Sequence, residues 1–310
     1  MVLYVGLWAV YALEGRELLA MDNKGPIIIV GAGRTGTTVF HRMLSEHPHL
    51  AWLPGRILSR SPDRLALGRL VMQGLDYPVL GELLKRRIRP GENYPFWEHH
   101  CKGFSAPYRD LLATDVTDKA RSHLPRTMAK VLTEKRNRLL LKITGWPRIG
   151  FLSEIFEDAR FIHVMRDGRA VANSMLNVYF WRGWKGPHDW GWGKLSPARE
   201  EEWNEYGQSF VVLAAIQWKM LMDAMEAAKS TISSDRFLEV RYENLCADPI
   251  GQFQKVTQFC ELEWTGGFER QIRKFQPKNT NDKFRYELTA RQQSDLEESL
   301  GDYLMRYGYL

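Results

Sequence analysis

Residues 26–40, PIIIVGAGRTGTTVF, restrict the fold more than any other stretch of the chain. The β-branched run predicts a buried strand that ends at Gly31, and apolar side chains recur at helical spacing after Thr37. A strand, a glycine-rich turn and a helix N-terminus in this order form an anion site from backbone N–H groups and the helix dipole. We therefore expect a P-loop-like phosphate-binding loop directly after the first strand.

The rest of the chain continues the alternation of strands and helices. Three further strands are expected in the segments RLLLKITG, RFIHVMRDG and RFLEVRYENL, which start at residues 138, 160 and 236. Such alternation predicts a parallel sheet with helices on both faces. The expected fold class is α/β, a three-layer sandwich with a central parallel sheet that binds its ligand at the carboxyl ends of the strands.

We assign residues 26–310 to one domain and residues 1–25 to an N-terminal extension, expected to be a helix. The extension begins MVLYVGLWAVYALEGRELLAM, and its apolar run of about a dozen residues is too short to span a bilayer. It also lacks the basic start and the cleavage site of a secretory signal. Two interpretations remain: a helix docked on the domain, which we favour, and a peripheral membrane contact through residues 1–20.

The charge of the chain indicates the class of ligand, and its cysteine content indicates the cellular compartment. The formal charge is +6, and no run of five basic residues occurs, so anionic small ligands are favoured over nucleic acid. The densest basic cluster, LLKRRIRP (83–90), is interpreted as a solvated helix end that an acidic substrate could also use. The three cysteines are widely spaced and form neither a metal motif nor a disulfide framework. A reducing compartment, the cytoplasm, is therefore expected.

The phosphate loop departs from that of ATP enzymes. Gly31 and Gly36 have the spacing of G-x-x-x-x-G-K-[ST], but Thr37 stands at the lysine position and Thr38 follows it. Arg34 lies inside the loop and can supply a positive charge from another direction. The strand FIHVM is followed by arginine and not by a magnesium-binding aspartate. We expect a phosphate-bearing nucleotide that is bound without a metal.

The stretch IIIVGAGRTGTTVFHRMLSEHP resembles the 5′-phosphosulfate loop of sulfotransferases that use 3′-phosphoadenosine 5′-phosphosulfate (PAPS). A second signature of that family, an arginine and a serine eight residues later that hold the 3′-phosphate, is matched by Arg166 and Ser174 in VMRDGRAVANS. RYENLCADP (241–249) and KFRYELT…YLMRYGYL (283–310) match two more family patterns. The resemblance runs from about residue 26 to the C-terminus and is nearest to bacterial-type members.

This resemblance implies the reaction and most of the site. The expected reaction is metal-independent, in-line transfer of the sulfuryl group of PAPS to a hydroxyl or amine, with positioning and electrostatic stabilisation as the main sources of catalysis. Arg34 would neutralise charge on the leaving oxygen, and Lys142, in LLLKITGWP, would lie beside the sulfonate. The residues expected to bind the nucleotide are Gly33, Arg34, Thr35, Gly36, Thr37, Thr38, Arg166, Ser174 and Tyr242, the last as an adenine contact.

The general base of the family is not found at its usual positions. Cytosolic members carry a histidine two residues after the lysine, where this chain has Thr144. Another branch carries a glutamate after the first helix, but LAWLPGRILSR contains no carboxylate. We therefore expect the base in PGENYPFWEHH (90–100), among Glu98, His99 and His100. Neighbouring side chains on a helix point about 100° apart, so only one or two of these can face the site. The alternative is that all three decorate a surface helix.

The acceptor and the competing functions stay open. Segment 179–197, YFWRGWKGPHDWGWGKLSP, holds four of the 11 tryptophans and is either a core plug or a mobile lid over a ligand. Together with NYPFWEHH, it indicates a small-molecule, carbohydrate or lipid acceptor. The alternatives to sulfuryl transfer are a P-loop small-molecule kinase that uses ATP and Mg²⁺, and a non-catalytic module that binds a nucleotide or a lipid.

Overall fold

The computed structural model describes residues 24–105 and 108–310, so the helix expected within residues 1–25 lies outside the described residues except for Lys24 and Gly25, which are not helical. One five-stranded sheet occupies the centre, with the strand order β2-β3-β1-β4-β5 and parallel pairing throughout. Its strands are β1 (Ile27–Gly31), β2 (Leu50–Trp52), β3 (Arg138–Thr144), β4 (Arg160–Met165) and β5 (Phe237–Arg241).

Helices connect the strands and cover the sheet. They are α2 (Thr37–Leu44), α3 (Gly55–Leu58), α4 (Leu65–Gly74), α5 (Pro78–Arg87), α6 (Tyr94–His100), α7 (Asp118–Ala129), α8 (Ile149–Ile155), α9 (Gly168–Leu176), α10 (Pro197–Glu205), α11 (Phe210–Lys229), α12 (Tyr242–Ala247), α13 (Pro249–Phe259), α14 (Gly266–Ile272), α15 (Phe284–Glu287) and α16 (Ala290–Arg306). Short 3₁₀ turns occur at Ala113–Asp115, Gly183–Lys185, Ser234–Arg236 and Asn281–Lys283.

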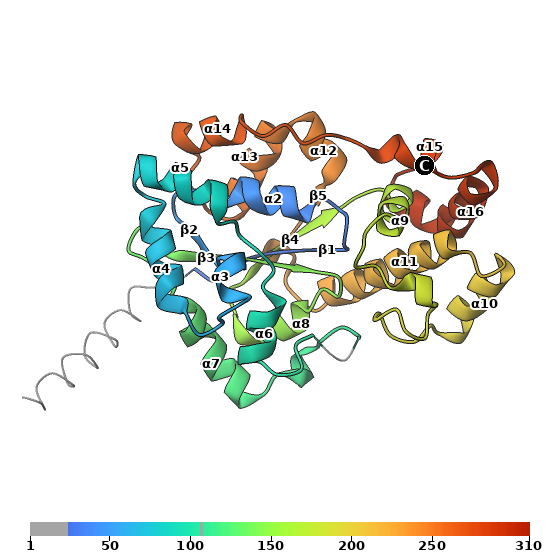
Figure 1. Cartoon of the computed structure of the whole chain (residues 1–310), viewed down its shortest axis with the longest axis horizontal. Coiled ribbons are helices and arrows are strands. Elements are labelled where there is room, and N and C mark those ends of the chain that lie inside the picture. Colours follow the sequence, from blue (N-terminus) through green and yellow to red (C-terminus); the bar gives the residue numbers. More distant parts are fainter. Residues whose placement is uncertain (1–23, 106–107) are drawn as a thin grey trace, which may run out of the picture.

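The helices form a layer on each face of the sheet. Figure 1 shows α2, α12 and α13 on one side and α8 and α11 on the other. Within the first layer, the rings of Phe40 on α2 and Phe253 on α13 stack with their centroids 5.0 Å apart. The expected parallel sheet and three-layer sandwich are therefore confirmed. The strand β2, which the sequence did not indicate, adds an edge to the sheet.

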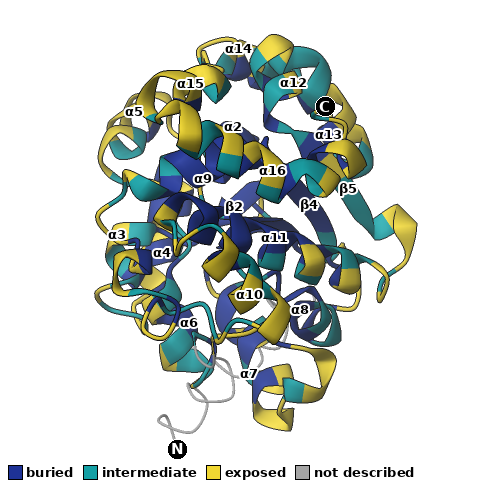
Figure 2. Ribbon diagram, turned by 90° about the vertical axis from the view of Figure 1, so that its right-hand side faces the viewer, coloured by how far each residue is buried: buried dark blue, intermediate teal, exposed yellow. Residues whose placement is uncertain are grey.

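The sheet core explains the apolar run that begins the fold. Residues 27–30 of β1 have no exposed surface, because this central strand is covered by helices on both faces. Figure 2 shows the buried sheet surrounded by helices whose outer residues are exposed. Within the described part of the chain, no helix is both long enough and apolar enough to cross a membrane.

Strand register brings the ends of the sequence motifs to one edge of the sheet. Gly31 at the end of β1 pairs with Thr144 at the end of β3, and Met165 of β4 pairs with Arg241 of β5. The connection after β1 runs toward β2 at one edge, whereas those after β3 and β4 run toward β5 at the other. Ligands bind where the connections of an open α/β sheet diverge in this way. The carboxyl end of β1 is therefore where the fold favours a ligand site.

His47, which follows α2, makes the stability of the fold depend on pH. Its Nε2 lies 3.0 Å from the carbonyl oxygen of Glu263, and its Nδ1 accepts a hydrogen bond from the N–H of His49. Burial lowers the pKa of His47 to about 4. The unfolded His47, with a pKa near 6.5, therefore binds more protons between pH 4 and 6.5, and this one residue should make the free energy of unfolding rise with pH by up to about 1.4 kcal/mol per unit.

Denaturant unfolding at pH 4.5, 5.5 and 6.5 tests this expectation. The variant His47→Gln should show a shallower rise of the unfolding free energy than the wild type, because it removes the buried titrating group. The variant His188→Gln, which removes an exposed imidazole, is the matched control. Equal slopes in the wild type and His47→Gln would show that another group causes the pH dependence.

Candidate active site

The loop between β1 and α2 is a compact turn that glycine makes possible. The backbone enters the left-handed region at Arg34 (φ 71°) and again at Gly36 (φ 91°). Thr35 is buried and its hydroxyl donates to the carbonyl oxygen of Ala32 over 2.8 Å. A Cβ at Gly36 would lie only 2.2 Å from the ring of Tyr242. The loop therefore packs directly against Tyr242 and leads into the N-terminus of α2.

Arg166 and Tyr242 lie side by side because β4 and β5 end together. Arg166 directly follows β4 and Tyr242 begins α12, and the guanidinium carbon lies 5.1 Å from the centre of the tyrosine ring. Arg166 donates to the carbonyl oxygen of Arg34 (3.1 Å), the hydroxyl of Thr280 (3.0 Å) and the side-chain oxygen of Asn281 (2.8 Å). Burial lowers the pKa of Arg166, which Tyr242 partly offsets. This buried cation faces the phosphate loop.

Arg34 links the phosphate loop to the second motif. Its Nε donates to the Ser174 hydroxyl on α9 over 2.9 Å, although 140 residues separate the two in the sequence. A cavity of about 500 Å³ opens between these elements, a volume typical of ligand sites. It is lined by Arg34, Gly36, Thr37, Thr38, Val39, Arg42, Arg166, Ala170, Asn173, Ser174, Asn177, Tyr242, Lys278, Thr280, Lys283 and Glu287. Five of these residues are basic and one is acidic, so the cavity suits a polyanion.

Part of this wall was not anticipated from the sequence. Lys278, Thr280 and Lys283 come from the segment between α14 and α15, and the hydroxyl of Tyr242 donates to the carbonyl oxygen of Lys278 over 3.0 Å. Asn281 in the same segment orients Arg166. The segment QPKNTNDK has no apolar period, and its only signal was an unusual density of polar side chains just before the C-terminal motif.

Lys142 joins the phosphate loop to a carboxylate. Its side chain on β3 is almost fully buried, and its Nζ lies 2.9 Å from the Thr38 hydroxyl and 2.8 Å from Glu92 Oε1. Glu92 precedes α6 and its side chain is about one quarter exposed (28 %). Glu92 lies within the stretch PGENYPFWEHH, but only its contact with Lys142 distinguishes it from the other acidic and basic side chains there.

A buried histidine lies next to this pair. Burial, followed by the charge of Lys142, lowers the pKa of His41 well below its usual value. The imidazole is therefore neutral and adds no second cation beside Lys142. Its Nε2 has no hydrogen-bond partner among the residues that the structure describes. The positive charge of Lys142 is therefore matched by the negative charge of Glu92, with no further charge from His41.

The structure places Glu98 away from the cavity at the phosphate loop. Its carboxylate accepts hydrogen bonds from the N–H groups of Gly103 (2.8 Å) and Ser105 (2.9 Å). Burial raises its pKa, but these two hydrogen bonds, the Ser105 side chain and the charge of Lys102 together hold the pKa of Glu98 below its usual value. A carboxylate held in this way supports the turn after α6 and is a weak proton acceptor.

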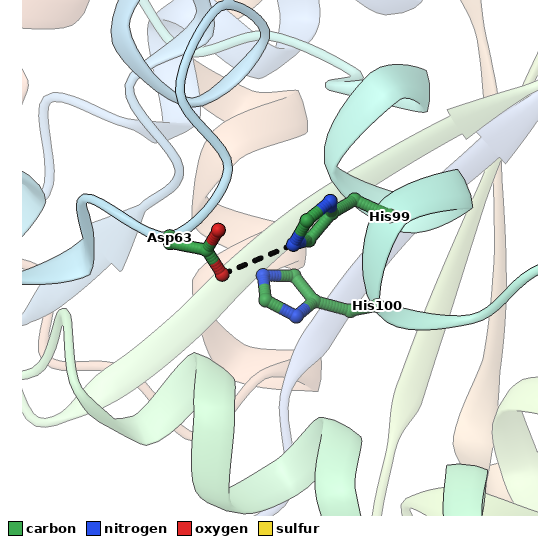
Figure 3. A group of neighbouring side chains, drawn as sticks. All are labelled: Asp63, His99 and His100. Carbon is green, nitrogen blue, oxygen red and sulfur yellow. Dashed lines mark hydrogen bonds and ion pairs between the residues drawn. The ribbon is translucent and has the colours of Figure 1, made fainter.

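His99 and His100 also lie outside that cavity. Figure 3 shows both rings directed toward Asp63, with His99 Nε2 3.0 Å from Asp63 Oδ1. His100 Nδ1 lies 3.2 Å from Nε2 of His123 on α7. The potential ligand atoms of Asp63, His99 and His100 lie within 4.8 Å of one another, so this surface group could hold a divalent cation. The structure does not bring any of the three candidates for the base to Lys142 and Thr38.

The tryptophan-rich segment 179–197 is anchored at two of its rings. Trp181 and Trp190 are buried, and Trp181 Nε1 donates to the side-chain oxygen of Gln217 over 2.8 Å. Trp192 packs over the end of β3, where a Cβ at Gly145 would lie 2.9 Å from its ring. The segment thus fills part of the core and also borders the strand that carries Lys142. Its mobility as a lid stays a prediction.

Known proteins resemble this chain over most of its length. Residues 26–266 match the model of the sulfotransferase family. The omega-hydroxy-beta-dihydromenaquinone-9 sulfotransferase Stf3 of Mycobacterium tuberculosis is 25% identical over 98% of this chain and 80% of its own length. Carbohydrate sulfotransferase 1 of Danio rerio is 22% identical over 79% of this chain and 64% of its own length.

Solved structures extend the likeness to the fold. Sulfotransferase STF9 from Mycobacterium avium superposes with a TM-score of 0.58 at 19% identity, covering 96% of this chain and 80% of its own. Sulfotransferase STF1 from Mycobacterium tuberculosis gives a TM-score of 0.53 at 16% identity, covering 91% and 80%. None of these comparisons supports the kinase or the non-catalytic module. Because the family model covers most of the chain, the protein belongs to the sulfotransferase family, enzymes that transfer a sulfuryl group to an acceptor.

Proposed function

We propose that the protein transfers the sulfuryl group of PAPS to a hydroxyl group of an apolar or carbohydrate acceptor. The observation that carries this proposal is the contact between Arg34 and Ser174, with Arg166 beside it. It joins two anion-binding elements in one basic cavity, the phosphate loop and the ends of β4 and α9. A nucleotide with phosphates at both its 5′ and 3′ positions needs two such elements, whereas ATP needs only one.

The residues of the cavity divide between the two ends of such a nucleotide. Backbone N–H groups of Gly33, Thr35 and Gly36 and the start of α2 suit the 5′ end, where Thr37 and Thr38 add hydroxyl donors. Arg166 and Ser174 suit the 3′-phosphate, and Tyr242 offers a ring face to the adenine. When bound, PAPS supplies the sulfuryl group that is transferred. Each of these assignments requires only residues that line or border the cavity.

Arg34 and Lys142 stabilise the charge that develops during the reaction. Lys142 reaches the phosphate loop, where its Nζ lies beside the Thr38 hydroxyl, and Arg34 extends from the loop to Ser174. Fixed cations in a partly buried site lower the energy of the transition state without reorganising. The buried position of Lys142 strengthens its effect, because little water screens its charge.

Glu92 is our candidate for the general base. Its carboxylate is the partner of Lys142 and is more exposed than the lysine, so it borders both the charged site and solvent. Glu92 takes the proton that the acceptor hydroxyl loses as its oxygen forms the new bond to sulfur. This assignment moves the base six residues upstream of Glu98, within the segment expected from the sequence.

The names of the relatives indicate the acceptor class, and the cysteines indicate the compartment. One relative is named for a hydroxylated menaquinone and another for carbohydrate, so we infer a hydroxyl acceptor on a lipid or a sugar. The three cysteines, Cys101, Cys246 and Cys260, are all free, which supports a cytoplasmic location.

Thermal unfolding with nucleotides tests the donor. Adenosine 3′,5′-bisphosphate at about 100 times its Kd should stabilise the protein by about 2.7 kcal/mol without magnesium. The expected rise in Tm is roughly 4–5 °C, because the unfolding entropy of a domain of this size is about 0.6 kcal/mol/K. ATP with Mg²⁺ should give a much smaller shift. A larger shift with ATP and Mg²⁺ would contradict the proposed donor.

A further inference from the structure

The start of α5 exposes an apolar patch that no part of the described chain covers. The patch consists of Tyr77, Pro78, Val79, Leu80 and Leu83, which line a shallow depression by themselves. The side chains of Tyr77, Val79 and Leu83 are 65 %, 78 % and 54 % exposed. A group of large exposed apolar side chains in one place marks a binding surface rather than ordinary surface variation.

The patch is held in place by close packing of α4 and α5. A Cβ at Gly81 would lie 2.6 Å from the carbonyl oxygen of Leu75, and one at Gly74 would lie 2.6 Å from Leu84. Figure 1 shows the two helices next to each other at the edge of the molecule. The buried side of α5 therefore faces α4, and its apolar patch is fixed on the outer side.

Positive charge surrounds the patch. The segment 55–89 contains eight basic and three acidic residues, a net charge of +5, which is most of the +6 of the whole chain. Lys85 pairs with Glu46, but Arg86 and Arg87 are exposed and form no ion pair within the described residues. An apolar patch with free cations beside it has the chemistry of a segment that lies in the interface of an anionic bilayer.

The same helix leads directly to the proposed reaction centre. Glu92 comes five residues after the end of α5, so it lies within about 18 Å of Arg87. The connection is firmly held: Gly55 N–H donates to the carbonyl oxygen of Arg89, and Gly91 packs against the Gly55 backbone. A docked α5 would therefore fix the position of Glu92 relative to the membrane.

A second cavity extends this connection. It has a volume of about 230 Å³, lies between α2 and the end of α5, and is lined in part by Ile88 and Arg89. Arg42 lines both this cavity and the basic cavity at the phosphate loop. The side of α5 and the basic cavity are therefore linked through one lining residue, Arg42.

We propose that the patch and the adjacent Arg86 and Arg87 dock the enzyme on the surface of a bilayer that contains anionic phospholipids, where it sulfates a membrane-borne hydroxyl. The proposal of a lipid acceptor rests on the proposed function, whereas the proposal that the patch binds a bilayer does not depend on it. The apolar side chains enter the acyl boundary, and the two arginines lie at the level of the lipid phosphates. The residues of this patch are different from residues 1–20, for which a membrane contact was considered from the sequence.

Vesicle sedimentation of the full-length protein tests docking without any nucleotide. The protein should sediment with phosphatidylcholine vesicles that contain 30% phosphatidylglycerol. Its partitioning onto pure phosphatidylcholine vesicles should be at least tenfold lower, because these carry no negative charge to attract the arginines. The variant Arg86→Gln/Arg87→Gln should reduce partitioning by about 25-fold, about fivefold for each charge removed. Val79→Ser/Leu83→Ser should reduce it by about tenfold or more, because it removes exposed apolar area.

Matched controls are Arg126→Gln/Lys130→Gln and Leu112→Ser/Met305→Ser, which change exposed residues elsewhere and should partition like the wild type. Wild-type binding by the patch variants would place any membrane contact elsewhere and overturn the proposal. A dimer that the patch variants dissociate would also overturn it, because the patch would then bind a second copy. The Tm shift with adenosine 3′,5′-bisphosphate should be unchanged in every variant. Sedimentation therefore tests docking alone, and the Tm shift tests the proposed donor alone.

Discussion

Replacing Glu92 by glutamine should lower kcat by a factor of about 10²–10⁴, the range for loss of a positioned general base. Glutamine keeps the size of the side chain and an oxygen that can accept from Lys142, but it cannot take a proton. The affinity for adenosine 3′,5′-bisphosphate should change little, because Glu92 does not line the basic cavity. Turnover with saturating donor and acceptor measures kcat, and titration of the nucleotide measures its affinity.

The same measurements decide between Glu92 and the candidates indicated by the sequence. Glu98→Gln, His99→Gln and His100→Gln each remove one of those groups, and the base is the residue whose loss lowers kcat by the stated factor. Glu134→Gln, which changes an exposed carboxylate elsewhere, controls for the loss of one negative charge. Near-wild-type turnover of Glu92→Gln would exclude the carboxylate of Glu92 as the base.

Removing the side chain of Arg166 should cost roughly 2–5 kcal/mol of binding free energy for adenosine 3′,5′-bisphosphate. Arg166 is largely buried, and three of its five N–H groups are held by Arg34, Thr280 and Asn281, so a phosphate would meet a fixed, desolvated cation. Isothermal titration of Arg166→Ala and the wild type gives the difference directly. We expect the loss to appear in nucleotide affinity more than in kcat at saturating donor.

Two further variants separate the charge of Arg166 from its geometry. Arg166→Lys keeps the charge but loses the planar fork of donors, so it should recover only part of the affinity. Arg291→Ala removes an arginine that is 86% exposed on α16 and should bind like the wild type. The Tm of each variant without nucleotide shows whether the fold is retained. If Arg166→Ala binds as tightly as the wild type, Arg166 does not contact the nucleotide.

The sequence predicted those parts of the fold that depend on local pattern. β1, β3, β4 and β5 are apolar runs that end near glycine or charge, and all four were expected from the sequence. β2 has only three residues, Leu50–Trp52, which is too short for a strand to show in the pattern. Its place at the edge of the sheet depends on pairing with β3, which no local signal reports.

In the site, too, the sequence predicted continuous motifs but not contacts between distant segments. The phosphate loop and the Arg166–Ser174 spacing are continuous motifs and were visible in the sequence. Glu92 and Glu98 stand six residues apart in one segment, and only the fold determines that Glu92 meets Lys142 while Glu98 accepts from backbone N–H groups. The contribution of residues 278–283 likewise comes from a segment with only a single 3₁₀ turn, which returns to the cavity.

The contact between Gly36 and Tyr242 limits how the donor specificity of this enzyme can be engineered. The ring occupies the space that a side chain at position 36 would need, so on the proposed assignment the 5′ side and the adenine side of the nucleotide site share one packing surface. A substitution at Tyr242 meant to admit a different base would also release the loop that carries Arg34. Altered donors are therefore better sought through the side chain of Lys278, which lines the same cavity, because Lys278 contacts Tyr242 only through its backbone carbonyl oxygen.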